Sequence, residues 1–346
     1  MSEKRISVIV PCYNVEQYVD RCLESLIQQT IGIENMEIIA VNDASQDGTL
    51  DRLKYYEEKY PESIVLISLE VNGGQAAARN TAMQYVSAPY IGFVDSDDYV
   101  HPEMFETMVN AIDTNDCDFV ECDWDFFSDI NGKYTPSSFE LGIPGKYDFS
   151  VRSVKDDYIS KQLFFTSVWN KVFRKSFLAE IEIWFPEGLR YEDMYFCYIA
   201  ILYSKSYYYV GGYFYHYFLN PNGTVQQRKK SFQLDIMDVA YSFLQTVKER
   251  GLYEEYKDEA DWMFMEKYYV YMIWDIWELL QEQTYDYYLE MKKAVKEIVP
   301  DYRNNPFRNL SENKMDNIIL KLIDMSLSKK EFEEIMDKLW KQQHKE

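Results

Sequence analysis

The sequence has few cysteines, no excess of positive charge and no long apolar run. Its five cysteines are odd in number and none stands in a C-x-x-C pair, so we expect buried thiols in a reducing compartment rather than a disulfide framework. The 58 Asp and Glu residues outnumber the 36 Lys and Arg residues, and this acidic balance argues against a nucleic-acid partner. The longest apolar run, residues 195–203, is too short to span a bilayer, and the polar residues 1–5 predict no signal peptide. We therefore expect a cytoplasmic protein.

Two glycine-rich signatures are missing after the first predicted strand. A G-x-G-x-x-G motif there would indicate a dinucleotide-binding dehydrogenase, so its absence argues against that class. A sugar-nucleotide pyrophosphorylase would show a Gly-rich signature with Arg and Lys at the same place. The chain instead reads Pro11-Cys12-Tyr13-Asn14-Val15-Glu16 at this place. The sequence therefore argues against a sugar-nucleotide pyrophosphorylase as well.

The first hundred residues alternate β-branched apolar runs with amphipathic stretches. Strands are predicted at residues 6–10, 36–41, 64–69 and 90–94, with a helix after each of them. This order predicts an α/β fold, in which helices cover both faces of a mostly parallel sheet. Asn14 with Gln17 predicts a capping box for the first helix, and Pro102 suits the first turn of the fourth.

The pattern changes after residue 116. Residues 120–126 alternate apolar with acidic side chains, which predicts a half-buried strand. We expect a hairpin or loop at 131–147 and strand with loop at 207–218. From about residue 230 the chain predicts helices only, at 231–250 and 254–283 and after a capping box of Ser328 and Glu331. We place the division between an α/β domain, 1–225, and a helical C-terminal region, 226–346.

An acidic cluster, Asp95-Ser96-Asp97-Asp98, directly follows the fourth strand. Ligands of open α/β sheets bind beyond the carboxyl ends of the strands. Carboxylates at that place can hold Mg²⁺ or Mn²⁺ together with phosphate oxygens, and an acidic chain needs such local help to bind an anionic nucleotide. The metal would neutralise charge on a leaving diphosphate. A solvated acidic turn is the alternative, because a D-x-D motif by itself is common.

Polar residues also follow the first two strands. Asp43 could accept a hydrogen bond from the imide N–H of uracil, or cap the next helix. Tyr13, in the turn with Pro11 and Asn14, could stack on a base or belong to the core.

The stretch before and within the third helix offers a second group of candidates. Gly73-Gly74 could let backbone N–H groups approach a ligand. Arg79 could meet a phosphate or position an aspartate, with a surface arginine as the alternative.

Three candidates lie further along the chain. In Glu192-Asp193, a carboxylate close to the sugar could remove a proton from an acceptor hydroxyl, or the pair could be a surface feature. His216 could ligate a metal, touch phosphates, or be structural. Trp169, in a Trp-Asn-Lys sequence, could line a sugar pocket or belong to the core.

Six stretches in this order resemble the family-2 glycosyltransferases with the GT-A fold. They are residues 7–14 (SVIVPCYN), 41–48 (VNDASQDG), 72–80 (NGGQAAARN), 93–98 (FVDSDD), 169–171 (WNK) and 192–193 (ED). The resemblance covers about residues 4–225. It implies the GT-A nucleotide-diphospho-sugar transferase fold, a Rossmann-like, mostly parallel sheet, here with a helical C-terminal extension.

The resemblance also implies roles for residues. Pro11, Tyr13 and Asp43 match nucleoside-binding positions, and Arg79 and Asp95 match positions near the ribose. Residues expected to complete the donor site are Asn14, Gly74 and Ser96.

The reaction centre follows from the same resemblance. Asp97 and Asp98 match the metal-binding part of the D-x-D motif, which of them ligates is left open, and His216 is a third candidate ligand. Asp193, with Glu192 beside it, matches the catalytic base.

The implied activity is transfer of a sugar from a UDP-sugar, with inversion, by a single in-line displacement through an oxocarbenium-like transition state. The Q-x-x-R-W motif of processive synthases is absent. We therefore expect one or a few sugars to be added to a glycan, lipid-linked or protein acceptor in bacterial surface polysaccharide synthesis. A non-catalytic nucleotide-binding or interaction module with the same fold is the alternative, against which the D-x-D motif and Glu192-Asp193 argue.

The helical region after residue 225 matches no motif of the family. Its last helices could dock on one of three alternative partners: another protein, a second copy of the chain, or the inner face of a membrane. Trp340 with Lys338 and Lys341 hints at such an interface, and a solvated terminal helix is the simpler alternative.

Overall fold

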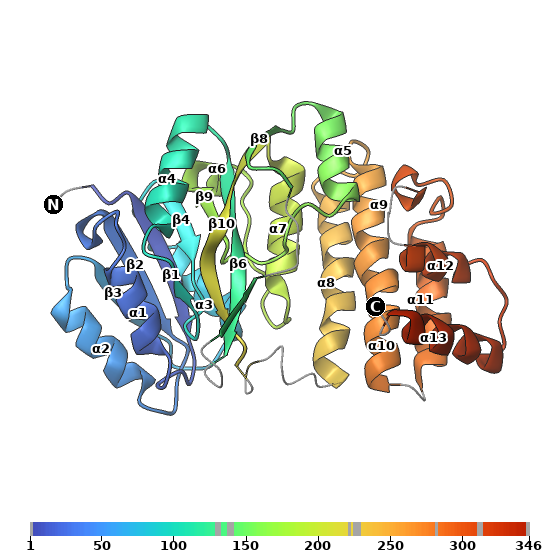
Figure 1. The fold of residues 1–346 in the computed structure, drawn as a ribbon, viewed down its shortest axis with the longest axis horizontal. Helices are drawn as coiled ribbons and strands as arrows, with labels where there is room; N and C mark the ends of the chain where they lie inside the picture. The colour runs from blue at the N-terminus through green and yellow to red at the C-terminus, as the bar shows by residue number, and fades with distance from the viewer. Residues whose placement is uncertain are drawn as a thin grey trace. The chain divides into compact units, whose positions relative to one another are not determined.

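The computed structural model describes residues 3–128, 133–136, 142–220, 223, 230–280, 283–309 and 314–343. The chain divides into two compact units, one of Met1–Lys155 with Leu163–Gln227 and one of Asp156–Gln162 with Arg228–Glu346. The first unit is built on a sheet and the second is helical (Figure 1). The predicted division at 225/226 falls outside the described residues and stays a prediction.

Four parallel strands form the first half of the sheet. They are β1 (Ile6–Cys12), β2 (Met36–Asn42), β3 (Ile64–Ser68) and β4 (Tyr90–Phe93), in the order β3-β2-β1-β4. The positions predicted for them are confirmed to within two residues. β1 and β4 are buried along their whole length, as expected for strands covered on both faces.

Helices connect these strands, at α1 (Val19–Ile27), α2 (Thr49–Lys59), α3 (Gly74–Met83) and α4 (Met104–Asn115). Two predicted helix starts are wrong. Pro102 precedes the N-cap of α4, Glu103, and so lies outside its first turn. Asn14 does not cap α1, because it adopts a left-handed φ of 52° and its side chain binds another turn.

The second half of the sheet mixes directions. Its strands are β5 (Tyr99–Val100), β6 (Phe119–Ser128), β7 (Lys133–Pro136), β8 (Gly145–Asp148), β9 (Lys171–Arg174) and β10 (Ser206–Phe218). The order continues β4-β9-β6-β10-β5, with β9 antiparallel to both neighbours and β6 parallel to β10. β7 pairs with β6 and β8 with β10, while 131–132 and 137–141 of the predicted hairpin or loop lie outside the described residues.

Burial corrects the prediction for β6. Glu121 is fully buried and Asp125 is 8% exposed, so the acidic face of the strand is covered rather than solvated. Each of the three acidic side chains has a partner: Glu121 pairs with Lys171, half-buried Asp123 accepts from the Tyr209 hydroxyl at 2.7 Å, and Asp125 pairs with His216. Alternation of apolar and acidic residues therefore did not mark a solvent-facing side.

Three further helices are α5 (Arg152–Ser160), whose residues are divided between the two units, α6 (Lys175–Glu180) and α7 (Glu192–Tyr203). The two glycines of β10, Gly211 and Gly212, have φ of 67° and 78°. The register with β6 shifts between Tyr209 and Tyr213, so these glycines form an irregularity in the strand.

The second unit contains α8 (Lys230–Glu249), α9 (Lys257–Met265), α10 (Met272–Leu280), α11 (Thr284–Ile298), α12 (Lys314–Leu322) and α13 (Lys329–Gln343). A π-helical segment, Glu266–Tyr271, joins α9 to α10. The Ser328–Glu331 capping box is confirmed, with Glu331 accepting from the Ser328 N–H at 2.8 Å. Among the described residues, no helix is both long and apolar enough to cross a membrane.

Candidate active site

The carboxyl ends of three parallel strands meet at one edge of the sheet. β1 ends at Cys12, β2 at Asn42 and β4 at Phe93. Tyr13, Asp43 and Asp95 therefore emerge at the edge where such sheets bind ligands. The Tyr13 side chain is 45% exposed, so its ring is open to solvent rather than part of the core. Pro11 is buried and is the last residue but one of β1.

Asp43 organises the start of α3. Its Oδ1 accepts a hydrogen bond from the Gly73 N–H and its Oδ2 from the Gly74 N–H, both at 2.8 Å. Asp43 does not cap the next helix, α2, whose N-cap is Gly48 and whose first residue, Thr49, donates its N–H to Asp47 at 3.0 Å. A carboxylate has about four lone-pair sites, so Asp43 keeps capacity to accept an imide N–H.

Asn14 joins two turns at this edge. Its N–H donates to the Ser45 hydroxyl at 3.1 Å, and its side-chain oxygen accepts from the Gln46 N–H at 2.8 Å. It thereby fixes the turn that carries Tyr13 beside the turn that carries Asp43. Gly74 has a left-handed φ of 82°, a backbone conformation that glycine adopts without steric cost.

Arg79 stands between two carboxylates. Its guanidinium donates to Glu192 Oε1 at 2.5 Å and to Asp95 Oδ1 at 2.8 Å, and lies over the Phe185 ring at 5.4 Å. The residue is 1% exposed, so the alternative of a surface arginine is wrong. Glu192 is 5% exposed, and Arg79 thus links two predicted site residues that are 97 positions apart.

Asp193 lies in the first turn of α7, half-buried beside Glu192. Burial raises the pKa of its carboxyl to about 7, and the negative charges of Glu192 and Asp95 act in the same direction. The positive charge of Arg79 opposes the rise. A carboxyl that titrates near neutrality is suited to accept a proton during a reaction.

The two remaining aspartates of the cluster have different environments. Asp98 is 1% exposed and accepts from the Tyr215 hydroxyl at 2.6 Å and the Phe218 N–H at 2.7 Å, one on each carboxylate oxygen. Asp97 accepts from the Asn220 side chain at 2.9 Å through Oδ2. Both oxygens of Asp98 therefore hold β10, which favours Asp97 as the aspartate that meets a ligand.

His216 is not brought into this cluster. Its Nδ1 lies 2.7 Å from Asp125 Oδ1, and its ring packs on Tyr99 at 4.6 Å. Across the described part of the chain, no three His, Cys, Asp or Glu side chains are grouped to hold a metal ion. Asp97, Asp98 and His216 are thus not grouped as one three-ligand cluster among these residues, and the predicted metal ligands stay a prediction.

A single carboxylate is still enough for a divalent cation whose other bonds go to phosphate oxygens and water. Mg²⁺ usually binds through one or two carboxylates together with substrate phosphates and water. Asp97, at the carboxyl edge of the sheet, supplies an oxygen ligand of that type. Ser96, by contrast, is 4% exposed, so its side chain packs inside the unit.

Several residues that build the site escaped the sequence analysis. Arg21 donates to the Asp97 carbonyl at 2.8 Å and lies over the rings of Phe127 and Phe218, at 4.6 and 5.0 Å. Tyr215 binds Asp98 and stacks on Trp169 at 4.3 Å. Trp169 is 4% exposed, which fits the core alternative. No local pattern marks Arg21 or Tyr215, because their partners are distant in sequence.

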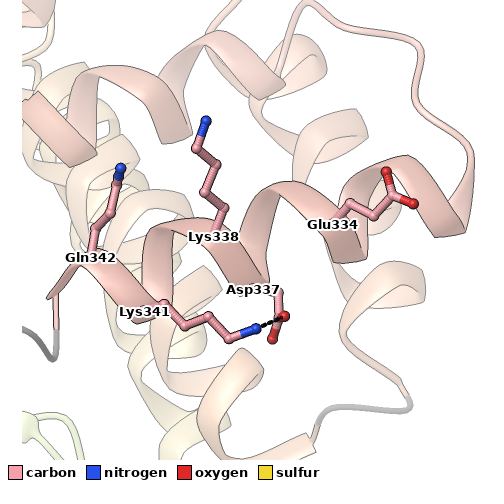
Figure 2. Close-up of a pocket in the computed structure, with 5 residues that line it drawn as sticks. All are labelled: Glu334, Asp337, Lys338, Lys341 and Gln342. Atoms are coloured by element: carbon pink, nitrogen blue, oxygen red, sulfur yellow. Dashed lines mark hydrogen bonds and ion pairs between the residues drawn. The ribbon is translucent and has the colours of Figure 1, made fainter.

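A hollow on α13 is unrelated to these residues. Figure 2 shows that Glu334, Asp337, Lys338, Lys341 and Gln342 line it, all from one helix. Lys341 pairs with Asp337 at 2.5 Å, and all five lining residues are polar or charged. This is the surface of a solvated helix, so the hint of an interface at Lys338 and Lys341 gains no support.

Comparison with known proteins identifies the family. Residues 7–182, half of the chain, match the family model described as glycosyl transferase family 2. The chain belongs to this family. The predicted relationship is thereby confirmed.

Two curated relatives are similar to this chain. A poly(ribitol-phosphate) beta-glucosyltransferase of Bacillus spizizenii is 35% identical over 221 residues, which are 63% of this chain and 33% of the relative. The putative glycosyltransferase EpsH of Bacillus subtilis is 33% identical over 271 residues, 75% of this chain and 74% of the relative. The chain thus spans about a third of the length of the first relative.

Solved structures share the fold of this family member. S. aureus TarS 1–349 superposes with a TM-score of 0.70 at 24% identity, covering 92% of this chain and 88% of that one. The same fragment in complex with UDP-GlcNAc gives a TM-score of 0.59 at 21% identity, over 87% and 92% of the two chains. The predicted GT-A class with a helical C-terminal extension is confirmed.

Proposed function

We propose that this chain transfers a sugar, with inversion, from a UDP-sugar to a hydroxyl of an acceptor glycan. The observation that carries the proposal is Asp193, a carboxyl with a pKa of about 7 that lies beside the Arg79–Glu192–Asp95 cluster. A base of that kind, next to a nucleotide-binding edge, is what acceptor activation requires. Membership of glycosyl transferase family 2 supports it.

The donor is held at the carboxyl edge. Asp43 accepts the uracil imide N–H, and the exposed ring of Tyr13 packs on the base. The ribose hydroxyls meet Asp95, whose carboxylate is oriented by Arg79 at 2.8 Å. Pro11 and Asn14 shape the turn beneath the base, and the Gly73–Gly74 turn keeps the backbone close to the ligand.

The chemical step balances within the site. Asp193 takes the proton of the acceptor hydroxyl as that oxygen bonds to the anomeric carbon. The bond from this carbon to the UDP oxygen breaks in the same step, which inverts the configuration. Asp97 would hold the divalent cation, Mn²⁺ or Mg²⁺, that stabilises the departing diphosphate. Glu192, held by Arg79 at 2.5 Å, fixes the start of α7 that carries the base.

The relatives suggest which substrates to test. One relative is named as a poly(ribitol-phosphate) glucosyltransferase and a structural neighbour binds UDP-GlcNAc. We propose UDP-glucose or UDP-GlcNAc as the donor and a polyol-phosphate polymer as the acceptor. Turnover of both donors, each with poly(ribitol phosphate), tests this choice. UDP binding without turnover of any donor would favour the non-catalytic alternative.

UDP binding is expected to depend on Mn²⁺. Calorimetric titration of UDP, with and without Mn²⁺, should show a clear gain in affinity with the metal. Asp97→Asn should reduce that gain by about tenfold or more, because a ligand is lost. Asp337→Asn, a change on exposed α13, should leave it intact. Equal UDP affinity with and without Mn²⁺ would contradict the metal assignment, and no UDP binding by the folded protein would contradict the donor site.

The pH dependence of transfer follows from the base. Asp193 accepts a proton only when it is ionised, so kcat/KM should fall as pH drops through its pKa of about 7. Below about pH 6 the loss should approach tenfold per pH unit. Initial rates between pH 5 and 9 measure the profile. A rate that stays constant over this range would remove Asp193 from the role of base.

A further inference from the structure

One asparagine side chain bonds to the main chain of Phe185 in both directions. Asn80 Nδ2 donates to the Phe185 carbonyl at 2.9 Å, and Asn80 Oδ1 accepts from the Phe185 N–H at 2.9 Å. Asn80 lies on α3 and is 8% exposed, while Phe185 lies in the connection between α6 and α7 and is 2% exposed. Buried main-chain groups outside helices and strands need such partners, and the amide of Asn80 satisfies both polar groups of Phe185.

The Phe185 ring touches the elements that carry the reaction centre. It lies 5.4 Å from the Arg79 guanidinium and stacks on the Phe196 ring of α7 at 4.3 Å, with 11° between the planes. A third contact, at 5.6 Å, is with Phe93, the last residue of β4. Asp193 precedes Phe196 by three residues on α7, which is less than one helical turn. The ring is therefore packed between the helix of the proposed base and the strand that leads to the acidic cluster.

Two adjacent residues of α3, Arg79 and Asn80, hold the two ends of one segment, residues 185–192. At the first end, Asn80 also donates to Glu187 Oε1 at 3.1 Å. At the other end, Arg79 pairs with Glu192 at 2.5 Å. The proposed base follows this segment directly in the chain, so α3 determines where the helix of the base begins.

We propose that Asn80 is a positioning residue for Asp193 and acts through the main chain of Phe185. By holding Phe185 it fixes the start of α7 relative to Arg79 and the acidic cluster, so that the base faces the bound donor sugar. The inference rests on the proposed role of Asp193. It gives the last residue of the 72–80 motif a task in the chemical step, although Asn80 contacts neither donor nor acceptor in the proposed site.

Hydrogen exchange of the substrate-free protein tests the positioning. Asn80→Leu keeps nearly the size and shape of the side chain but leaves the N–H and the carbonyl of Phe185 without their partners. Buried main-chain groups that lose their partners favour local opening. We expect the exchange rates of amides 194–198, in the first turns of α7, to rise by about tenfold more than those of the β2 amides.

Asn305→Leu is the matched control, because Asn305 makes the same pair of bonds in the other unit. Its side chain donates to the Asp258 carbonyl at 2.7 Å and accepts from the Phe307 N–H at 2.9 Å. At 4% exposure it is as well buried as Asn80. This change should leave the exchange of α7 amides relative to β2 amides unchanged.

Sugar transfer measures the consequence for catalysis. UDP release from UDP-glucose or UDP-GlcNAc, with poly(ribitol phosphate) as acceptor, gives kcat. In Asn80→Leu, kcat should fall by about 10- to 100-fold, because a displacement of about 1 Å in a reacting group costs up to about 10² in rate. The Kd for UDP should stay within about twofold of wild type, since neither Asn80 nor Phe185 meets UDP in the proposed site.

Each result supports the proposal or overturns it. Selective loosening of α7, with a lower kcat at unchanged UDP affinity, supports it. Exchange that rises equally in α7 and β2, or a wild-type kcat in folded Asn80→Leu, overturns it and leaves Asn80 a structural role.

A second variant covers the case in which Asn80→Leu does not fold. Phe185→Leu keeps the main-chain bonds to Asn80 and removes the ring that contacts α7. It should show the same selective loosening of α7, and exchange like that of wild type overturns the proposal. Failure of the proposed function is distinguishable, because Asp193→Asn then keeps the wild-type transfer rate, whatever the exchange of α7.

Discussion

Replacing Asp193 with Asn is expected to abolish sugar transfer while UDP still binds. The amide has nearly the shape of the carboxylate but cannot accept the acceptor proton. General bases contribute about 10²- to 10⁴-fold to rates, so kcat should fall by at least two orders of magnitude. In the proposed site UDP meets Asp43, Tyr13 and Asp95 rather than Asp193 itself, so its Kd should change by less than about twofold.

Rates and binding must be measured on the same preparation. UDP release in the presence of donor and acceptor gives kcat, and calorimetry gives the Kd. Asp286→Asn, which removes an exposed carboxylate from the first turn of α11, is the control and should retain full activity. Parallel loss of transfer and of UDP binding in Asp193→Asn would make Asp193 structural, and normal transfer would exclude it as the base.

Arg79→Met should produce the largest loss of stability. The change leaves Glu192 and Asp95 without their cation, and Glu192 is 5% exposed. Removing one partner of a buried ion pair costs about 3–5 kcal/mol. The methionine fills much of the space over Phe185, so the loss reflects charge rather than a cavity.

Hydrogen exchange separates this effect from the behaviour of the helical unit. The free energy of opening for β1 and β4 amides should fall by about 3–5 kcal/mol in Arg79→Met. Arg303→Met, which removes an arginine whose side chain is 63% exposed, should change stability by less than about 0.5 kcal/mol. Adding Glu192→Gln to Arg79→Met should recover part of the loss. Unchanged exchange in Arg79→Met would show that the cluster is not stabilising.

Local patterns were enough to locate the first four strands. Residues 6–10 and 36–41 are β-branched or apolar runs that end in polar turns, and both strands are buried on two faces. The carboxyl edge follows from the parallel arrangement alone. The family resemblance of the 72–80 and 192–193 stretches then named Arg79 and Glu192, which the structure brings into contact.

Distant partners explain what the sequence could not predict. Asp97 and Asp98 are adjacent and chemically identical, yet only Asp98 has both oxygens bound to β10. Glu121 looked solvent-facing because its partner, Lys171, lies 50 positions away. His216 carried the right ligand chemistry, but its ring packs on Tyr99 and pairs with Asp125. The side of a strand on which a polar residue is tolerated depends on such partners.

The tie between Asp98 and the end of β10 also sets an order of events during synthesis. Asp98 is bound by Tyr215 and Phe218, which follow it by 117 and 120 residues. At about 5–20 residues per second, a ribosome needs roughly 6–24 s to cover that distance. The first four strands leave the ribosome early, whereas the acidic turn gains its permanent neighbours only afterwards. During that interval Asp98 lacks both donors that hold it in the folded protein, so the acidic turn is completed last.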